Sequence, residues 1–532
     1  MTFISEELAA RFHHFGSHTY VQEGGQFVYP EDVSVGSNVF IRSHYWFNVI
    51  SPGLGTSPKI IIGDGTQCNL GLVISAVNRV ELKANVLTGP NVYISDTDHQ
   101  YREVGIPIHS QGITSYMHRV EIGEGAWIGA NAVIVGNVKV GKGSVISANS
   151  VVTGDIPDYC VAGGSPAKIL RVYDPASGQW LRTRSKREAA RILDRRKEQP
   201  LLSICIPTYN RASDLEQCLE SIYSQIGDTD LIEVRVSDNA STDATQKVLK
   251  RYAEQYPSFH YQHNAENIGA DPNIMHVLGQ GKGKFLKIQG DDDFYVPETL
   301  IPLLHVLHTY KDCSVIHIDL LQPTGVVEGG EGLEAFLNKS SIYSSFISAT
   351  ILRREDWERI EDKGLYLDSS FNQIYWQYAM LEQNPRFCVV HRSMFTYAGN
   401  DTASYNFGRV FIDSYQRILQ HFVGRGLSGE SIRADKQRVF YSFILPWFQR
   451  FASSGSGKLE GFEIYFSQHY GNEPITLKPC SRFSLLQRDT LLCNDSHSST
   501  WLKFHYPVIK HEEPSENCSF QRVLLCIRIK EI

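Results

Sequence analysis

The chain has 532 residues, of which 42% are hydrophobic and 20% are charged, and its formal net charge is -7. Domains commonly have about 100–150 residues, so this length predicts more than one folding unit, and the composition excludes disorder over most of the chain. The weakly negative balance argues against a dedicated nucleic-acid-binding protein.

The chain shows no sign of export or membrane insertion. Its ten cysteines include no CxxC pair and fit neither a disulfide framework nor a zinc site. The N-terminal segment lacks the basic and apolar regions of a signal peptide, Thr2 stands where myristoylation requires glycine, and no window has ~18 uninterrupted apolar residues. We expect a cytoplasmic protein, at most peripheral to the inner face of a membrane.

A six-residue period runs through residues 35–152. Steps of six from Ile62 reach Cys68, Ile74, Val80, Val86 and Val92, and steps of six from Ile122 reach Ile128, Ile134, Val140, Ile146 and Val152. An inward branched residue every six positions, with glycine often next to it, predicts short strands stacked in a parallel β-helix. A β-sandwich, the alternative, would alternate in twos along longer strands.

These repeats resemble the left-handed β-helix, hexapeptide-repeat acyltransferases, over about residues 20–172. The resemblance implies acetyl transfer from acetyl-CoA to a sugar, with the active site beside a loop ejected from the solenoid between Val92 and Ile122. It places His99 as the catalytic base, with Asp96 or Asp98 available to orient the ring, and Asn69 as the residue that positions the acceptor. A neutral imidazole is suited to act as a catalytic base near pH 7.

The same resemblance implies that acetyl-CoA lies in a groove between subunits, and therefore a homotrimer. The matching cofactor positions are Gly129, Ala130, Ser147, Ala148 and Lys168. Related carbonic anhydrase solenoids bind zinc through three histidines, but the spacing of His99, His109 and His118 matches no compact metal motif.

Residues 173–199 lose the hexad period and become basic. The run RTRSKREAARILDRRK at 182–197 holds eight Lys and Arg residues against Glu188 and Asp194, and it favours a helix. We interpret this segment as a helical linker. A solvated surface is the simpler role for its charges, and contact with anionic lipid headgroups is the functional alternative.

From residue 200 the chain alternates strands with helices. Apolar runs LLSICIPTYN, LIEVRVSDNAS, FHYQHNAEN and GKFLKIQGDDDF are separated by amphipathic segments, which predicts a mostly parallel, Rossmann-like α/β sheet with ligands at the carboxyl ends of its strands. Polar residues cluster at those ends, namely Thr208, Asn210, Arg211, Asp238, Asn239, Asn267, Asp291, Asp292 and Asp293.

The set IPTYNR, SDNASTDAT, NIGADPN and GDDDF resembles the GT-A, family 2 glycosyltransferases over about residues 201–300. The resemblance implies a nucleotide-sugar donor, expected to be UDP-linked, and a DxD pair, Asp291 and Asp293, that holds Mn²⁺ or Mg²⁺. Carboxylate oxygens are the hard ligands that these cations prefer. Asp238 is expected at the nucleotide base, and Thr208, Asn210, Arg211, Asn267 and Asp292 in the same donor site.

The catalytic base of glycosyl transfer departs from the family pattern. The family often uses the aspartate of a downstream Glu-Asp pair, but Glu355-Asp356 and Glu361-Asp362 lie in a segment typical of an exposed helix. The later segment LYLDSSFNQIYW supplies only Asp368, which is our candidate.

We therefore expect four parts: a left-handed β-helix acetyltransferase at 1–172, a basic helical linker at 173–199, a GT-A glycosyltransferase at 200–400 and a mostly helical extension at 401–532. Within the extension, residues 452–532 contain no motif, and Cys480, Cys493, Cys518 and Cys526 are too widely spaced to name a site. The leading hypothesis is a bifunctional enzyme of capsule or lipopolysaccharide synthesis that acts on a saccharide or lipid-linked saccharide. The alternatives are a glycosyltransferase trimerised by an inactive solenoid, or a C-terminal carbohydrate-binding module without transfer activity. The donor sugar, the acceptor, the acetylated group and the order of the steps stay open.

Overall fold

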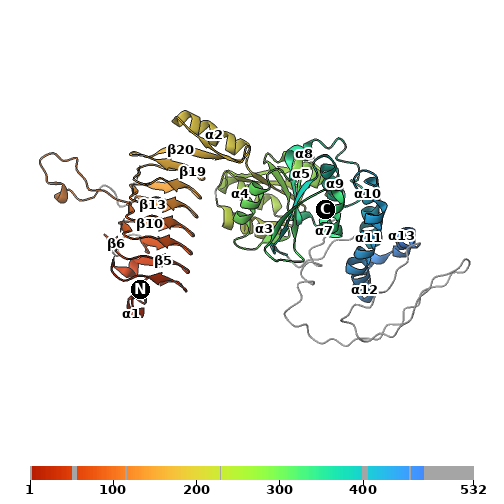
Figure 1. Ribbon diagram of the computed structural model, residues 1–532, viewed down its shortest axis with the longest axis horizontal. Helices are drawn as coiled ribbons and strands as arrows, with labels where there is room; N and C mark the ends of the chain where they lie inside the picture. Colours follow the sequence, from red (N-terminus) through yellow and green to blue (C-terminus); the bar gives the residue numbers. More distant parts are fainter. Residues whose placement is uncertain are drawn as a thin grey trace, which may run out of the picture.

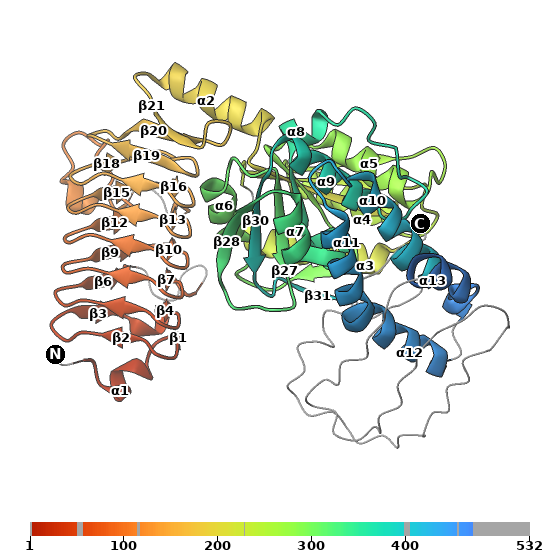
Figure 2. The ribbon, with the colours of Figure 1, turned by 45° about the vertical axis from the view of Figure 1, so that its right-hand side comes forward.

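The computed structural model describes residues 3–50, 57–113, 117–227, 229–397, 405–454 and 457–471. Figures 1 and 2 show a solenoid of stacked short strands beside a second unit built around a sheet covered by helices. The helix α2 (Lys186–Glu198) lies over the joint between them. Cys480, Cys493, Cys518 and Cys526 lie outside the described residues.

Three parallel sheets form the walls of the solenoid, which confirms the predicted parallel β-helix. The first wall contains β1 (His14–Phe15), β4 (Val33–Val35), β7 (Ile60–Ile62), β10 (Arg79–Leu82), β13 (Arg119–Ile122) and β16 (Val138–Val140). The second contains β2 (Tyr20–Val21), β5 (Phe40–Ile41), β8 (Gln67–Cys68), β11 (Leu87–Thr88), β14 (Trp127–Ile128), β17 (Val145–Ile146), β19 (Cys160–Gly163), β20 (Lys168–Asp174) and β21 (Gln179–Arg182). The third contains β3 (Gln26–Val28), β6 (Trp46–Val49), β9 (Val73–Ala76), β12 (Tyr93–Ser95), β15 (Val133–Val135) and β18 (Val151–Val152).

The twelve hexad positions all point into one core, where each is at most 2% exposed. Their register nevertheless differs from a strict six-residue count. Ile62 pairs with Leu82, 20 positions along, because residues 77 and 78 widen one corner. From β13 onward the coils are shorter, and Ile128 pairs with Ile146, 18 positions along.

The solenoid does not end where the hexad period ends. Strands β20 and β21 continue the second wall as antiparallel strands. Helix α2 then packs Ala189 and Ile192 into the solenoid core, so the basic helix closes the end of the β-helix. Its Lys186, Arg187 and Arg191 side chains are exposed.

The second unit contains an eight-stranded sheet in the order β24 (Phe259–His263), β23 (Ile232–Asp238), β22 (Leu202–Thr208), β25 (Phe285–Ile288), β29 (Thr350–Arg353), β27 (Val315–Asp319), β30 (Arg386–His391) and β28 (Val327–Glu331). The four predicted strands β22 to β25 are parallel neighbours, whereas β29 runs antiparallel to both strands beside it. A separate pair joins β26 (Asp293–Tyr295) to β31 (Phe395–Tyr397).

Helices cover both faces of this sheet. One core packs against α3 (Ala212–Ile226), α4 (Thr245–Gln255) and α6 (Leu300–Thr309). The opposite core packs against α5 (Ala270–Gln280), α7 (Leu333–Ser340), α8 (Arg354–Glu358) and α9 (Asn372–Gln383). The same core includes residues of α10 (Tyr415–His421), α11 (Gly429–Val439), α12 (Leu445–Ser454) and α13 (Phe462–Tyr470), so the described part of the extension completes it. A short helix α1 (Glu6–Ala9) opens the chain.

Candidate active sites

The solenoid loop that carries His99 leaves the end of β12 and returns at β13. In Figure 1 this loop projects from the solenoid on the side away from the second unit. His99 is exposed and pairs through its backbone with Ile113. No side-chain hydrogen bond joins its ring to another described residue, so the imidazole faces solvent.

Asp96 does not orient His99. Its buried carboxylate accepts hydrogen bonds from the backbone N–H groups of Val77, Asn78 and Arg79, at 2.7 to 2.8 Å. These groups belong to the widened corner of the preceding coil, so Asp96 stabilises the fold of the solenoid. Of the two carboxylates expected beside the ring, only that of Asp98 is exposed on the loop.

The expected acceptor and cofactor residues lie on a different edge of the solenoid from His99. Asn69 follows β8 of the second wall, and Gly129 and Ser147 occupy the equivalent corners after β14 and β17. Ala130 and Ala148 stand next along those corners. Lys168 is exposed at the start of β20. Within a single chain, His99 therefore lies apart from the residues expected to bind the acceptor and acetyl-CoA.

Two of these corner residues have evident structural contacts. A Cβ at Gly129 would lie 2.5 Å from the backbone nitrogen of Ala148, so the stacking of the coils requires glycine there. The Asn69 side-chain oxygen accepts from the backbone of Leu70 at 2.8 Å, while its backbone N–H donates to Thr88.

In the second unit, the carboxyl ends of β22 and β23 bring the expected donor-site residues together. Asp238 is fully buried and accepts from the backbone of Ser241 and from the His263 ring at 2.9 Å. Asn210 accepts from the backbone of Thr242 at 2.8 Å. The buried Thr208 hydroxyl has no hydrogen-bond partner in the part of the chain that the structure describes, so an unpaired polar atom lies at this edge.

The amides beside Asp238 form a second group at the same edge. Asn239 donates to the side chain of Asn267 at 2.7 Å, and its oxygen accepts from Asn264 and from the backbone of Ile268. These bonds fix the loop between β24 and α5 against the end of β23.

The three consecutive aspartates are buried in a turn rather than extended along a strand. β25 ends at Ile288 and β26 begins at Asp293, whose backbone N–H bonds the carbonyl of Gly290. The strand therefore does not continue through Asp291 and Asp292. The Arg211 guanidinium lies 2.7 Å from Asp292 and 3.8 Å from Asp291, whereas Asp293 accepts from Ser348 at 2.5 Å.

Basic side chains from outside the GDDDF run therefore lie next to this turn. Arg211 comes from the start of α3, and the buried ammonium of Lys287 lies below the turn, bonded to Gln289 and to the carbonyl of Ser348. Burial lowers the pKa of Lys287 to about 7, against the opposing effect of Asp293. Three carboxylates still exceed these two cations, and their oxygens are of the class that binds Mg²⁺ or Mn²⁺. Among the described residues no three acidic, His or Cys side chains form a metal cluster, so such a cation would need oxygens from the donor diphosphate.

Asp368, the expected glycosyl-transfer base, is exposed. Its side chain is 68% accessible and both carboxylate oxygens accept from the Arg417 guanidinium, at 3.1 and 3.2 Å. Sequence reasoning missed two buried residues nearby, Ser348 and Asp271. Only Asp271 left a signal, as a lone acid between Gly269 and Pro272 at a helix start.

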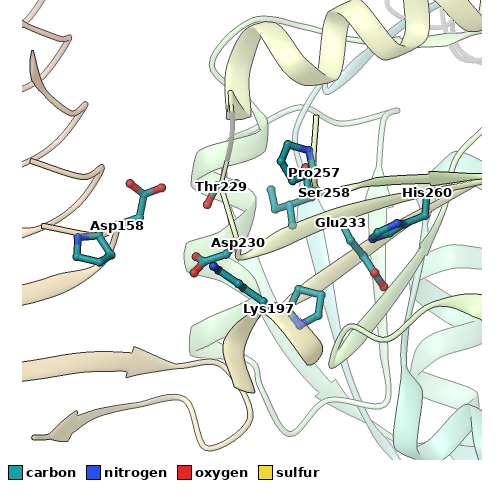
Figure 3. A pocket seen from close by; sticks show the side chains of 11 residues that line it. Asp158, Lys197, Thr229, Asp230, Glu233, Pro257, Ser258 and His260 are labelled. Carbon is teal, nitrogen blue, oxygen red and sulfur yellow. The ribbon is translucent and has the colours of Figure 1, made fainter. Parts of the chain in front are cut away.

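A cavity of about 380 Å³ lies between the two units (Figure 3). Asp158 lines it from the solenoid side, and Lys197, Asp230, Glu233 and His260 line it from the other side. It opens at the amino ends of β23 and β24, opposite the edge that holds Asp238. The cavity is therefore separate from the expected donor site.

Both regions are similar to known proteins. Residues 119–154 match the model of the bacterial transferase hexapeptide (six repeats), and residues 203–326 match glycosyl transferase family 2. The chain is 26% identical over 284 residues to abequosyltransferase RfbV of Salmonella typhimurium, covering 46% of this chain and 81% of that protein. It is 32% identical over 139 residues to a "probable acetyltransferase" of Mycobacterium tuberculosis, covering 26% of this chain and 42% of that protein.

Among solved structures, TarS of Staphylococcus aureus matches with a TM-score of 0.36 at 19% identity, covering 45% of this chain and 42% of that one. No helix among the described residues is both long enough and apolar enough to cross a membrane. The two family matches place a hexapeptide-repeat region and a family 2 glycosyltransferase region in one chain.

Proposed function

We propose that this chain, which joins a hexapeptide-repeat transferase region to a family 2 glycosyltransferase region, is a bifunctional enzyme of surface polysaccharide synthesis. One unit transfers acetyl from acetyl-CoA to a sugar hydroxyl or amine. The other transfers a sugar from a nucleotide donor to a saccharide or lipid-linked saccharide. The single observation that carries the proposal is the presence, in one chain, of an exposed histidine on a solenoid loop and a buried carboxylate turn at the sheet edge that also holds Asp238.

In the acetyl-transfer step, His99 takes the proton from the acceptor oxygen or nitrogen as that atom attacks the thioester carbonyl. The sulfur of coenzyme A then leaves as the carbon–sulfur bond breaks. Because Asn69, Gly129, Ala130, Ser147, Ala148 and Lys168 lie away from His99 in one chain, the complete site needs His99 from one copy and the cofactor edge of another. The proposal therefore includes a homotrimer.

The surface of the solenoid supports this assembly. The second and third walls carry outward apolar side chains that are 36–51% exposed, namely Tyr20, Trp46, Leu87, Tyr93 and Trp127. The first wall instead carries the charged residues Glu81, Glu121 and Lys139 at equivalent positions. Exposed apolar side chains that recur along two walls favour burial against a partner.

In the glycosyl-transfer step, Asp238 and its neighbours Thr208, Asn210 and Asn267 bind the nucleotide, and Arg211 with Asp292 borders the diphosphate. A divalent cation, when bound, neutralises the charge of the leaving diphosphate. Asp291 and Asp293 supply the carboxylates for it. The exposed Lys186, Arg187 and Arg191 of α2 are the residues that would contact anionic lipid near a lipid-linked acceptor.

A second candidate function is a glycosyltransferase trimerised by an inactive solenoid. Its specific support is that the His99 ring lacks the carboxylate partner expected from Asp96, which the fold uses elsewhere.

One screen separates the two functions. The full chain is incubated with acetyl-CoA and a panel of amino and neutral sugars, and separately with UDP-, GDP-, CDP- and dTDP-sugars and Mn²⁺. Release of free thiol together with release of nucleotide diphosphate supports the bifunctional enzyme. Release of nucleotide diphosphate without free thiol favours the scaffold, and release of neither contradicts both.

A further inference from the structure

Asp271 is a buried acid at the sheet edge that holds Asp238. It lies in the first turn of α5 and is 6% exposed. The same turn is fixed to the end of β23, because the Asn273 side chain accepts from the Ser237 hydroxyl at 2.7 Å. The loop before it is fixed by the Asn239–Asn267 bond at 2.7 Å. Asp271 is therefore held rigidly next to the expected donor site.

The carboxyl group of Asp271 is only partly satisfied. The backbone N–H groups of Ser370 and Asn372, just before and at the start of α9, lie close enough to lower its pKa. Its Oδ2 atom is buried and has no hydrogen-bond partner among the described residues. Buried polar atoms in folded proteins nearly always find a partner, so an unpaired carboxylate oxygen is a group that a ligand can satisfy.

Two hydrogen bonds connect this position to the aspartate turn. Gln373 of α9 donates to the carbonyl of Ser345 at 2.8 Å, and Ser348, three residues further, donates to Asp293 at 2.5 Å. The start of α9, which binds Asp271, is thus coupled through one short segment to the turn expected at the diphosphate.

The start of α9 supplies no acid of its own. Residues 369–373 read Ser-Ser-Phe-Asn-Gln, and the preceding Asp368 is engaged by Arg417 in solvent. A solvated carboxylate paired with arginine is a weak base. Asp271 reaches the same position from another helix.

We propose that Asp271 is the general base of glycosyl transfer, an inference that rests on the glycosyltransferase activity proposed above. The acceptor hydroxyl gives its proton to the carboxylate of Asp271. Its oxygen bonds to the anomeric carbon while the bond from that carbon to the diphosphate oxygen breaks, and the diphosphate leaves with the bonding electron pair.

The electrostatics of the site agree with this role. Burial raises the pKa of Asp271 to about 7, against the two backbone N–H groups, and the charge of Asp368 adds to the rise. Asp368 is the charged group that acts on this carboxyl group from a neighbouring element, and Asp368 itself pairs with Arg417. A general base works best when its pKa is near the operating pH. Turnover should therefore rise with pH and level off above about 7 as Asp271 loses its proton.

The test compares variants of the full chain on the nucleotide sugar that the donor screen identifies. Asp271→Asn keeps an oxygen for the two backbone donors but cannot accept a proton. We expect kcat to fall by ~10²–10⁴-fold with the rising pH limb lost. Binding of UDP with Mn²⁺, measured by calorimetry, and acetyl transfer should be unchanged. Asp271→Glu should recover part of kcat, and Glu266→Gln, an exposed acid on the same loop, is the matched control.

Three other results would contradict the assignment of Asp271 or the proposed glycosyl transfer. Loss of kcat in Asp368→Asn, with near-normal turnover in Asp271→Asn, would return the base to Asp368. A wild-type pH profile that is flat between pH 5 and 8 would also overturn the proposal, even if Asp271→Asn folds poorly. If the wild-type chain turns over no nucleotide sugar, the proposed glycosyl transfer itself fails.

Discussion

Arg196 of helix α2 forms an ion pair with Asp230, which precedes β23, across the joint between the two units. Its side chain is completely buried, and its guanidinium lies 2.7 Å from the Asp230 carboxylate. Burial raises the pKa of Asp230, and the positive charge of Arg196 opposes that rise. Arg195 beside it pairs with Asp174 at 2.9 Å, so the basic linker connects both units through specific contacts.

Removing one partner of this buried pair should loosen the joint. Arg196→Ala leaves Asp230 unpaired, which typically costs about 3–5 kcal/mol for a buried pair. We expect a lower unfolding midpoint and faster proteolysis near residues 183–200. Arg191→Ala, an exposed arginine on the same helix, is the control and should change neither. Equal behaviour of the two variants would show that the joint does not depend on the ion pair.

The solenoid should be separable only together with its closing helix. A fragment of residues 1–199 retains Ala189 and Ile192 in the solenoid core, whereas a fragment of residues 1–183 exposes the apolar surface they cover. We expect the longer fragment to be soluble and trimeric and the shorter one to aggregate. Sedimentation of both fragments checks this. A monomeric 1–199 fragment would contradict the proposed trimer.

The regular parts of the fold were predictable because each repeat carries its own signal. Every hexad position from Ile62 onward is buried, and the four parallel strands β22 to β25 follow the apolar runs. The extra length of one coil was not predictable. The longer coil is held by Asp96, which accepts hydrogen bonds from the backbone N–H groups of residues 77–79 in the preceding coil. A six-residue period in the sequence does not predict such a contact between coils.

In the candidate sites, too, contacts between distant segments could not be predicted from the sequence. The acids of the GDDDF run were visible in the sequence, but their partners were not, since Arg211 and Ser348 are 81 and 55 residues away from the carboxylates they contact. Asp271 was overlooked because its chemistry comes from burial against α9. Burial between distant segments is a property of the packed chain.

His99→Ala should abolish acetyl transfer without disturbing the fold. The exposed ring packs into no core, so its removal should leave the unfolding midpoint and the trimer unchanged. Loss of a general base typically lowers the rate by ~10²–10⁴-fold. Thiol release from acetyl-CoA measures the effect, with His109→Ala on the same loop as the control. Near-normal thiol release by the His99 variant would favour the scaffold function.

The raised pKa of Asp271 predicts a pH dependence of stability that needs no substrate. The folded chain holds this proton up to about pH 7, whereas an unfolded aspartate loses it near 3.9. Between these values the folded state binds more protons, so this group lowers the free energy of unfolding as pH rises. Asp271→Asn removes the effect. The unfolding midpoint of the wild type, relative to that of the variant, should therefore fall from pH 4.5 to pH 7.

The final prediction concerns the divalent cation that the aspartate turn is proposed to bind. Asp291 and Asp292 share Arg211, so one guanidinium faces two carboxylates, while Asp293 is held by Ser348. Asp291→Asn leaves the Arg211–Asp292 pair and the Ser348 bond in place. It should therefore remove the Mn²⁺ dependence of UDP binding without lowering the unfolding midpoint. Asp293→Asn should also weaken metal-dependent binding, because one carboxylate of the proposed pair is neutralised.

Calorimetry of UDP with and without Mn²⁺ separates these effects from folding. Asp312→Asn, an exposed acid outside the site, is the control and should bind as the wild type does. Acetyl transfer should be normal in all three variants, since the acetyl-transfer step proposed for the solenoid uses no metal. If the Asp291 and Asp293 variants both kept the full Mn²⁺ dependence, the cation would be held by other ligands, and the turn would serve mainly to position Arg211.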